Sequence, residues 1–407
     1  MTSVQTRAVR RIRHDVNQQP FMVIWEVTRA CQLACRHCRA DSIHVRNPGE
    51  LTTAEGMRLF DQIASFGKPH PIMILTGGDP FERPDLAELT AYGSSVGLHM
   101  ALSPSATPNV TVERLAEMRE AGATAMSLSL DGARAETHDA FRGFAGTYER
   151  TLASAALINE AGFRLQVNTT VTQATVRELP ELYLQMLDLH VHLWSLFFLV
   201  PTGRGQSLQG LTAQECEDVL HWMVDISRHL AVKTTEAQHF RRVVLQRAAA
   251  ELDGLGAEAF APGALYHWLS ARTAELTADR TLPDRPPRPP IDTNAGRGFA
   301  FIDHLGNVYP SGFLPLKVGN VGEQCFTEIY RDAPVMRALR DPSGFGGSCG
   351  VCEFREICGG SRSHAYAVTG DPLAADPSCL YVPPPETRRE AHRWPRTHAD
   401  DVQRPSP

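Results

Sequence analysis

Three cysteines near the N-terminus have the residue type and the spacing to hold a metal centre. Cys31, Cys35 and Cys38 form a C-x3-C-x2-C triad shortly after the apolar run from Phe21 to Trp25. A cysteine used for packing is usually buried singly, so this grouping points to a soft metal. A structural zinc ion takes four ligands, whereas a cluster held by three thiolates keeps one iron open. The triad favours an iron–sulfur cluster, with zinc as the alternative.

Four more cysteines form a second group near the C-terminus. They follow the pattern C-x2-C-x5-C-x20-C and are Cys349, Cys352, Cys358 and Cys379. Four thiolates complete either a structural zinc site or a closed [4Fe–4S] cluster, and spacing alone leaves both open. Cys216 and Cys325 stand alone, and we interpret them as packed or surface thiols.

The totals describe an ordinary globular protein with unusual cysteine use. Nine cysteines in 407 residues, without a secretory signal, do not suggest a disulfide framework. The net charge of -6 argues against nucleic acid as a partner, and no apolar stretch is long enough to cross a membrane. The sequence therefore predicts a cytoplasmic protein with no nucleic-acid or membrane partner.

The elements that must position the cysteines alternate between strand and helix. Strands are predicted at Phe21–Val27, Pro71–Leu75, Leu98–Leu102, Thr124–Leu130, Arg164–Val171 and Leu193–Val200. Helices are predicted between them at Thr52–Phe66, Asp85–Gly97, Val112–Ala121, Tyr148–Gly162 and Leu179–Leu189. Such alternation implies a parallel sheet with right-handed crossovers. Six units predict an α/β fold, a partial (β/α)6 barrel of the TIM type that is open on one side.

The triad and a glycine motif together resemble a known family. Gly77-Gly78-Asp79-Pro80 follows the second strand, and this pair of motifs resembles the radical S-adenosylmethionine (radical SAM) superfamily. The resemblance implies an oxidoreductase-type enzyme with a [4Fe–4S] cluster whose open iron binds S-adenosylmethionine. Reductive cleavage would then give a 5′-deoxyadenosyl radical that abstracts hydrogen from a substrate. Two departures are His37, where many members have an aromatic residue, and Asp79, where glutamate is usual.

The resemblance also implies contacts to the cofactor. Adjacent glycines at a strand end leave room for close approach of a ligand, which favours cofactor binding by the motif. The implied cofactor-binding residues are Gly77, Gly78, Asp79, Pro80, Ser103, Ser129, Asp131, Arg142, Asn168 and Val200. The ribose and methionine would meet Ser129, Asp131 and Asn168, the adenine Val200, and the methionine carboxylate Arg142. Capping or strand-end hydrogen bonding explains each single polar residue equally well.

The second cysteine group resembles the SPASM extension of radical SAM enzymes. That extension normally holds two auxiliary clusters, but here Ser311 and Arg362 replace two of its cysteines. The reduced pattern resembles the twitch variant and implies one auxiliary [4Fe–4S] cluster, with an electron-relay or a structural role. The expected organisation is a disordered tail (1–20), a radical SAM core (21–210), a helical connector with a Pro-rich linker (211–291), a twitch/SPASM-like α+β domain (292–382) and a second disordered tail (383–407).

Two substrate classes remain open within this resemblance. The C-terminal spacing is most similar to enzymes of alternative heme and heme d1 synthesis, which act on tetrapyrrole side chains. Other members modify ribosomal peptides, and a non-catalytic zinc or iron–sulfur protein is a remote alternative. The implied partners are a small-molecule or peptide substrate and an external one-electron reductant of the flavodoxin or ferredoxin type. Cations that could face an anionic substrate are Arg297, His304, Lys317, Arg362 and His364.

Overall fold

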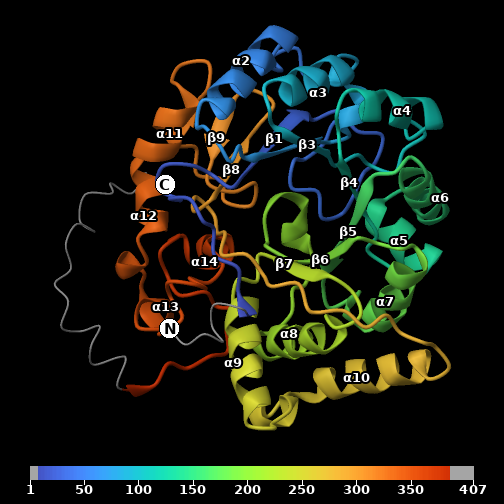
Figure 1. Cartoon of the computed structure of the whole chain (residues 1–407), viewed down its shortest axis with the longest axis vertical. Coiled ribbons are helices and arrows are strands. Elements are labelled where there is room, and N and C mark those ends of the chain that lie inside the picture. The colour runs from blue at the N-terminus through green and yellow to red at the C-terminus, as the bar shows by residue number, and fades with distance from the viewer. Residues whose placement is uncertain (1–7, 386–407) are drawn as a thin grey trace.

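Ten strands form one continuous sheet in the computed structural model, which describes residues 8–385 (Figure 1). The strands are β1 (Met22–Thr28), β2 (Ile72–Gly77), β3 (His99–Leu102), β4 (Ala125–Ser129), β5 (Arg164–Val171), β6 (Leu193–Phe198), β7 (Val232–Thr235), β8 (Phe299–Ile302), β9 (Asn307–Tyr309) and β10 (Gly319–Asn320). Their order is β10-β9-β8-β1-β2-β3-β4-β5-β6-β7. Strands β1 to β7 are parallel, and β8 extends the same parallel array beside β1.

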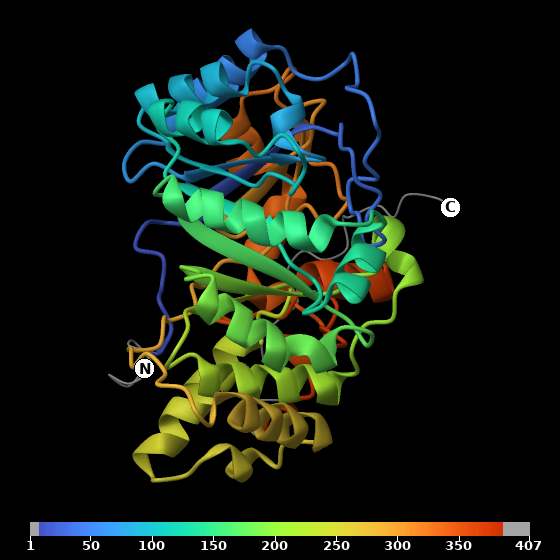
Figure 2. The same cartoon turned by 90° about the vertical axis from the view of Figure 1, so that its right-hand side faces the viewer.

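The helices lie around this sheet, and those between its parallel strands cover its outer side (Figure 1). They are α2 (Thr53–Ala64), α3 (Leu86–Ser95), α4 (Val112–Glu120), α5 (Ala135–Arg142), α6 (Thr147–Glu160), α7 (Leu179–Asp188), α8 (Ala213–Ile226), α9 (Phe240–Leu252), α10 (Ala264–Thr277), α11 (Phe326–Asp332), α12 (Pro334–Arg340), α13 (Gly347–Gly350) and α14 (Arg362–Thr369). Figure 2 shows teal and green helices in front of the strands. Capping boxes at Thr52–Glu55 and Thr212–Glu215 start α2 and α8, because each threonine and glutamate satisfies backbone donors of the first turn.

The predicted partial barrel is confirmed, with additions from outside the expected core. All six predicted strands are present, and β5 has the predicted bounds. The seventh parallel strand, β7, is a four-residue segment inside the region that we expected to be helical. Strands β8 and β9 form an antiparallel pair around a turn that contains Gly306. Since β8 also pairs with β1, the segment 292–382 contributes directly to the barrel sheet.

The sheet has two chemically different faces. The core lies between the sheet and the helices, where Trp194 of β6 meets Trp222 of α8 edge-on with ring centroids 6.0 Å apart. Side chains of successive strand residues alternate between faces. In β5 the outward Leu165 and Val167 are fully buried, whereas the inward Gln166 and Asn168 are half-buried. The inner face of the barrel therefore carries polar groups.

The described part of the expected N-terminal tail, residues 8–20, packs against the body of the molecule. Val9 is buried against Leu245 and Ile357, and the amide of Arg10 donates to the carbonyl of Pro290 in the Pro-rich linker at 2.9 Å. Apolar burial and main-chain pairing thus hold this segment. Residues 1–7 and 386–407, which contain most of the two tails predicted from composition, lie outside the described residues.

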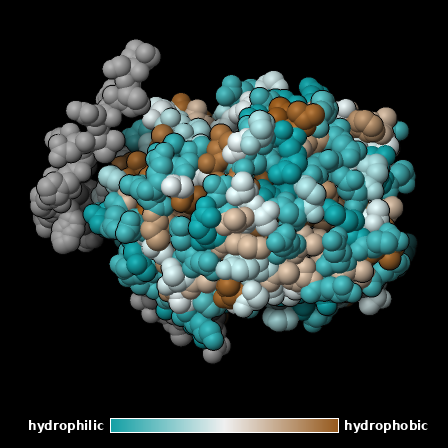
Figure 3. Space-filling view, turned by 90° about the horizontal axis from the view of Figure 1, so that it is seen from above, coloured by the Kyte–Doolittle hydropathy of each residue, from teal (hydrophilic) through white to brown (hydrophobic). Residues whose placement is uncertain are grey.

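No helix among residues 8–385 has the length and apolar character needed to cross a membrane. The face shown in Figure 3 is mostly hydrophilic, and its hydrophobic residues form small separate patches.

Candidate functional site

The triad lies on the loop between β1 and α2, at the carboxyl end of the first strand. Three separate segments hold this loop through main-chain hydrogen bonds. The amide of Cys31 donates to the carbonyl of Ile43 at 2.8 Å, and the amide of Arg36 donates to the carbonyl of Phe141 at 2.9 Å. The amide of Arg204, beyond β6, donates to the carbonyl of Cys38 at 3.2 Å. The loop is therefore ordered by the fold around it as well as by its own turns.

Each sulfur of the triad faces a hydrogen-bond donor. The backbone amides of Leu33 and Ser42 lie 3.4 Å from Sγ of Cys31 and 3.5 Å from Sγ of Cys38. Nη1 of Arg142 lies 3.6 Å from Sγ of Cys35. Burial raises the pKa of Cys31 to about 11. Burial opposes ionisation of Cys38 too, but the Ser42 amide and the Arg204 guanidinium bring its pKa below the ordinary value. These donors suit thiolate sulfurs of a cluster, whose potential depends on such contacts.

The glycine motif lets β2 lie unusually close to the start of the triad loop. A Cβ on Gly77 would lie 2.4 Å from the carbonyl oxygen of Thr28, and one on Gly78 would lie 2.3 Å from that of Ala30. The amides of Gly78 and Asp79 donate to the same two carbonyls. We expected the glycines to make room for a ligand. In the structure the space on the Cβ side of both glycines is taken by the backbone that leads to Cys31, and contact of the motif with a ligand stays a prediction.

Asp79 organises the loop after β3. Its carboxylate is fully buried and accepts hydrogen bonds from the Thr107 hydroxyl at 2.6 Å and from the amides of Phe81 and Ser105 at 3.1 and 3.3 Å. Burial raises the pKa of Asp79 to about 6 despite these bonds. Pro80 begins the short 3-10 turn Pro80–Glu82, for which Asp79 is the N-cap. The Asp79 side chain therefore holds the loop after β3 and the turn Pro80–Glu82 in place through these hydrogen bonds.

Asp131 and Arg142 are brought together directly beneath the triad. The guanidinium of Arg142 pairs with the Asp131 carboxylate through Nη2 and reaches Cys35 through Nη1. Asp131 also accepts the amide of Thr170 at 2.7 Å. Burial alone would raise the pKa of Asp131, but Arg142 holds it below the usual value. Two residues proposed separately from the sequence therefore form one buried ion pair that touches a candidate cluster ligand.

The other predicted cofactor residues line the inner face of the barrel near the same end. Ser129 of β4 lies opposite Asn168 of β5 in the strand register, and Asn168 accepts a hydrogen bond from Gln166 at 2.6 Å. Ser103 accepts one from Ser127 at 2.8 Å. Val200 follows β6 and is buried. The register thus places Ser129 beside Asn168, and contact of these four residues with a cofactor remains a proposal.

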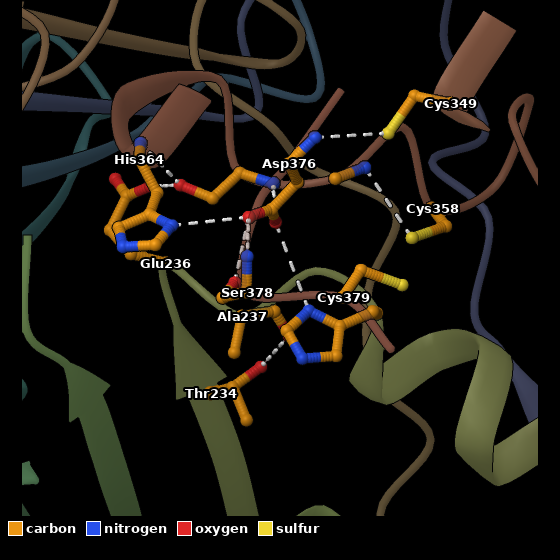
Figure 4. Close-up of polar contacts among 12 residues, drawn as sticks. Thr234, Glu236, Ala237, Cys349, Cys358, His364, Asp376, Ser378 and Cys379 are labelled. Carbon is orange, nitrogen blue, oxygen red and sulfur yellow. Dashed lines mark hydrogen bonds and ion pairs between the residues drawn. The ribbon is translucent and has the colours of Figure 1, made fainter. Parts of the chain in front are cut away.

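The four C-terminal cysteines line a single cavity together with Arg242 and Tyr381. Figure 4 shows the sulfurs of Cys349, Cys358 and Cys379 on one side of Asp376. Backbone amides again point at sulfur: that of Asp376 lies 3.4 Å from Sγ of Cys349, and that of Gly360 lies 3.4 Å from Sγ of Cys358. This arrangement repeats the environment of the triad.

The spacing of these thiols suits a cluster better than a single ion. Within residues 8–385, no three or more His, Cys, Asp or Glu side chains converge closely enough to hold one metal ion. A zinc ion needs its sulfurs about 2.3 Å away, whereas a [4Fe–4S] cluster is larger. Burial raises the pKa of Cys352 to about 12 and that of Cys379 to about 11. Such thiols ionise when a metal replaces the proton.

A buried hub joins the barrel to the second cysteine group, and the sequence did not reveal it. Glu236, directly after β7, has a φ of 60°, and its carboxylate accepts the hydroxyls of Ser311, Ser361 and Ser363 at 3.2, 2.6 and 3.0 Å. Burial raises the pKa of Glu236. The one available signal was Ser311, which stands where the SPASM pattern has a cysteine. The hub places a hydrogen-bonded carboxylate beside that position.

Most cations that we expected to face an anionic substrate have partners inside the protein. Arg297 pairs with Asp292, His304 contacts Glu26 at 3.0 Å, and His364 contacts Asp376 at 3.2 Å. Arg362 is buried beside Cys349, and Lys317 is exposed. Charge counting along the sequence could not foresee the pairing of His304, because its partner Glu26 lies 278 positions away in the chain.

Lys233 of β7 is a cation on the inner face that the sequence did not single out. It lies opposite Ser195 in the register of β6 and β7, and Ser195 lies opposite Asn168. The ammonium group of Lys233 makes no side-chain hydrogen bond or ion pair with any other residue in the described range. Burial, with help from Arg288, lowers the pKa of Lys233 to about 8. The row Ser129, Asn168, Ser195 and Lys233 therefore ends in an unpaired ammonium group.

Comparisons with known proteins agree with this geometry. The model of the radical SAM superfamily matches residues 25–184. An AdoMet-dependent heme synthase of Methanosarcina barkeri is 38% identical over 371 residues, which cover 89% of this chain and 97% of that protein. A pre-heme d1 synthase of Dinoroseobacter shibae is 33% identical, covering 90% of this chain and 87% of that protein. The solved structure of Streptococcus suis SuiB bound to precursor peptide SuiA superposes with a TM-score of 0.62 at 17% identity, covering 89% of this chain and 76% of that one.

Proposed function

This chain belongs to the radical SAM superfamily, in the group with a cysteine-bearing SPASM-type extension, and we propose that its substrate is a tetrapyrrole with carboxylate side chains. The observation that carries this proposal is the 38% identity to an AdoMet-dependent heme synthase along nearly the whole length of that protein. The likeness to SuiB bound to precursor peptide SuiA is one of fold at 17% identity, so a peptide substrate is the weaker alternative.

The chain is an enzyme that uses S-adenosylmethionine and iron–sulfur clusters. When bound, the open cluster and S-adenosylmethionine supply a 5′-deoxyadenosyl radical that removes a hydrogen atom from the substrate. We propose that the open cluster is held by Cys31, Cys35 and Cys38, in a core that spans 21–210. We propose that the auxiliary [4Fe–4S] cluster is held by Cys349, Cys352, Cys358 and Cys379, in a domain that spans 292–382 and follows the connector 211–291.

The chain's own residues have defined tasks in this proposal. Arg142 and Asp131 hold the triad from below, and Gly77 and Gly78 bring the triad loop against β2. The row of polar residues on the inner face, which includes Ser129 and Asn168, offers hydrogen-bond donors and acceptors to the cofactor. Ser103 and Val200 would contribute further contacts to it. A one-electron reductant of the flavodoxin or ferredoxin type is expected as an external partner.

Lys233 supports a substrate that carries carboxylates. An ammonium group without an acidic partner on a half-buried inner wall is costly unless a ligand supplies the counter-charge. Because Lys233 lies in the same row as Asn168 and Ser195, a carboxylate that meets it would place the substrate inside the barrel. The reacting side chain would then lie toward the cofactor end of the row.

The test is a hydrogen-transfer assay with reconstituted, reduced protein. Iron-bound tetrapyrroles deuterated on their propionate side chains are compared with candidate peptides, and deuterium is sought in 5′-deoxyadenosine by mass spectrometry. We expect transfer from the tetrapyrrole. Transfer from a peptide alone would refute the substrate assignment, and failure to form any 5′-deoxyadenosine with both clusters present would refute the activity.

A further inference from the structure

Arg362, the first residue of α14, is a buried cation that faces a sulfur. Its side chain has no solvent exposure, and Nη2 lies 3.5 Å from Sγ of Cys349. Nη1 donates to the carbonyls of Pro372 and Ala374 at 3.1 and 2.7 Å. The guanidinium carbon lies 4.4 Å from the ring centroid of Phe345. The group is thus fixed in place by three kinds of contact.

No carboxylate balances this charge. Within residues 8–385, Arg362 forms no ion pair with an aspartate or glutamate. Its surroundings are carbonyl oxygens, an aromatic ring and the sulfur of Cys349. A guanidinium stays protonated in proteins, and a buried charge without a partner destabilises the fold. The Cys349 sulfur and a negatively charged group bound by the cysteine cavity are therefore the counter-charges that the geometry offers.

A second arginine beside the same cavity has the same property. Arg241 is 6% exposed and donates to the carbonyls of Ile357 and Cys358 at 3.0 and 3.4 Å, and to that of Thr293. It has no carboxylate partner among the described ion pairs. By contrast, Arg242, which also lines the cavity, is neutralised by Glu217. Arg241 is partly balanced at longer range by Asp292, which also pairs with Arg297. Arg362 is therefore the guanidinium that best suits the net negative charge of an iron–sulfur cluster with four thiolates.

We propose that Arg362 is a positioning residue that sets the reduction potential of the auxiliary cluster through its charged contact with Cys349. Reduction adds one negative charge to the cluster, and a fixed cation at the ligand sulfur stabilises that charge in a low-dielectric site. The potential is therefore higher than hydrogen bonds from backbone amides alone would set it. Arg362 occupies a position at which the SPASM pattern has a cysteine ligand. In this chain the residue at that position would adjust the reduction potential of the cluster instead of binding its iron.

The inference rests on the proposed auxiliary cluster but not on the substrate. The experiment is a potentiometric titration followed by electron paramagnetic resonance, without substrate, on reconstituted protein lacking the first cluster (C31A/C35A/C38A). Arg362→Gln removes the charge and keeps a donor, and Arg362→Lys keeps the charge. Phe345→Leu is the matched control, since it loosens the same packing without changing charge.

For Arg362→Gln we expect at least a tenfold weaker electron affinity, equivalent to about 59 mV toward negative potential for one electron. Arg362→Lys and Phe345→Leu should stay within about threefold of the parent, which is about 30 mV by the same constant. An unchanged potential in Arg362→Gln, or an equal fall in Phe345→Leu, would overturn the proposal. If Arg362→Gln does not assemble a cluster, the Arg362→Lys variant decides. A cluster in Arg362→Lys with the parent potential supports the role of the charge, and failure of both variants to assemble a cluster overturns the proposal.

The same preparations separate this inference from the proposal beneath it. A parent protein that lacks the first cluster and binds no iron would refute the auxiliary cluster itself. The hydrogen-transfer assay addresses the substrate, and its result does not affect the measured potential.

Discussion

Nη1 of Arg142 lies 3.6 Å from Sγ of Cys35, while Nη2 of the same guanidinium pairs with Asp131. One buried side chain thus ties Cys35, a proposed cluster ligand on the first loop, to the carboxyl end of β4. The pair is almost fully buried, with Asp131 at 1% and Arg142 at 8% exposure. Because both charges are out of water, neither can be removed without consequence for the other.

Replacement of Arg142 by methionine should therefore destabilise the apoprotein by about 3–5 kcal/mol, since Asp131 is left as an unpaired buried charge. Denaturant unfolding measures this. The double variant Arg142→Met with Asp131→Asn should recover most of the lost stability, because no charge then remains. Recovery should not extend to S-adenosylmethionine affinity. A single variant with unchanged stability would contradict the pair's structural role.

Alanine at Gly78 should displace the triad loop. Its Cβ would lie 2.3 Å from the carbonyl oxygen of Ala30 and 2.6 Å from that of Arg29, distances at which backbone must move. We expect the reconstituted protein to fall from about eight to about four irons per chain, the content of one four-iron cluster. Gly210→Ala is the matched control, since nothing lies within 4 Å of its added Cβ. Equal iron in both variants would refute this account of the motif.

The two cysteine groups should assemble clusters independently. A variant with Cys31, Cys35 and Cys38 changed to alanine should keep about four irons and form no 5′-deoxyadenosine, because the second group supplies a complete ligand set. Changing Cys352 and Cys358 should likewise leave about four irons. Cys216→Ala should keep all of them, because Cys216 is buried on α8 and does not line the cysteine cavity. The iron and sulfide content of each variant is the measurement. Loss of iron in Cys216→Ala would contradict the proposed ligand assignment.

Substrate binding should depend on the charge of Lys233. Its pKa in the free protein is lowered to about 8 by burial and Arg288, so the ammonium is present below pH 8 and lost as the pH rises through that value. Affinity for a carboxylate-bearing tetrapyrrole, followed by its absorbance, should fall across this window. Lys233→Met should weaken binding about tenfold, or about 1.4 kcal/mol.

Two variants check that this effect comes from Lys233. Lys233→Arg should remain charged and lose the pH dependence above 8, because guanidinium does not titrate there. Lys317→Met should bind as the parent does, since Lys317 is exposed. A pH dependence that persists unchanged in Lys233→Met would assign it to another group.

Local patterns predicted most of the fold. Strand β5 has the bounds read from its alternation, and α7 (Leu179–Asp188) ends one residue before its predicted limit. Strand β7 was missed because Val232–Thr235 is too short to show a period between two helices. Helices α11 and α12 are separate, since Pro334 begins a new helix after Ala333. The secondary structure of long periodic segments was predicted correctly. That of short segments depends on pairing with neighbouring strands, which the local sequence does not show.

The sequence by itself determined the chemistry, because ligand type and close spacing are local properties of a loop. Cys31, Cys35 and Cys38 lie within eight residues, and no fold could place them far apart. The tertiary structure alone decided what surrounds these sulfurs. Arg142 and Cys35 are 107 positions apart in the chain, and Lys233 joins the inner row only through a strand that the pattern did not show. Such contacts depend on the register of the whole sheet, which no short segment specifies.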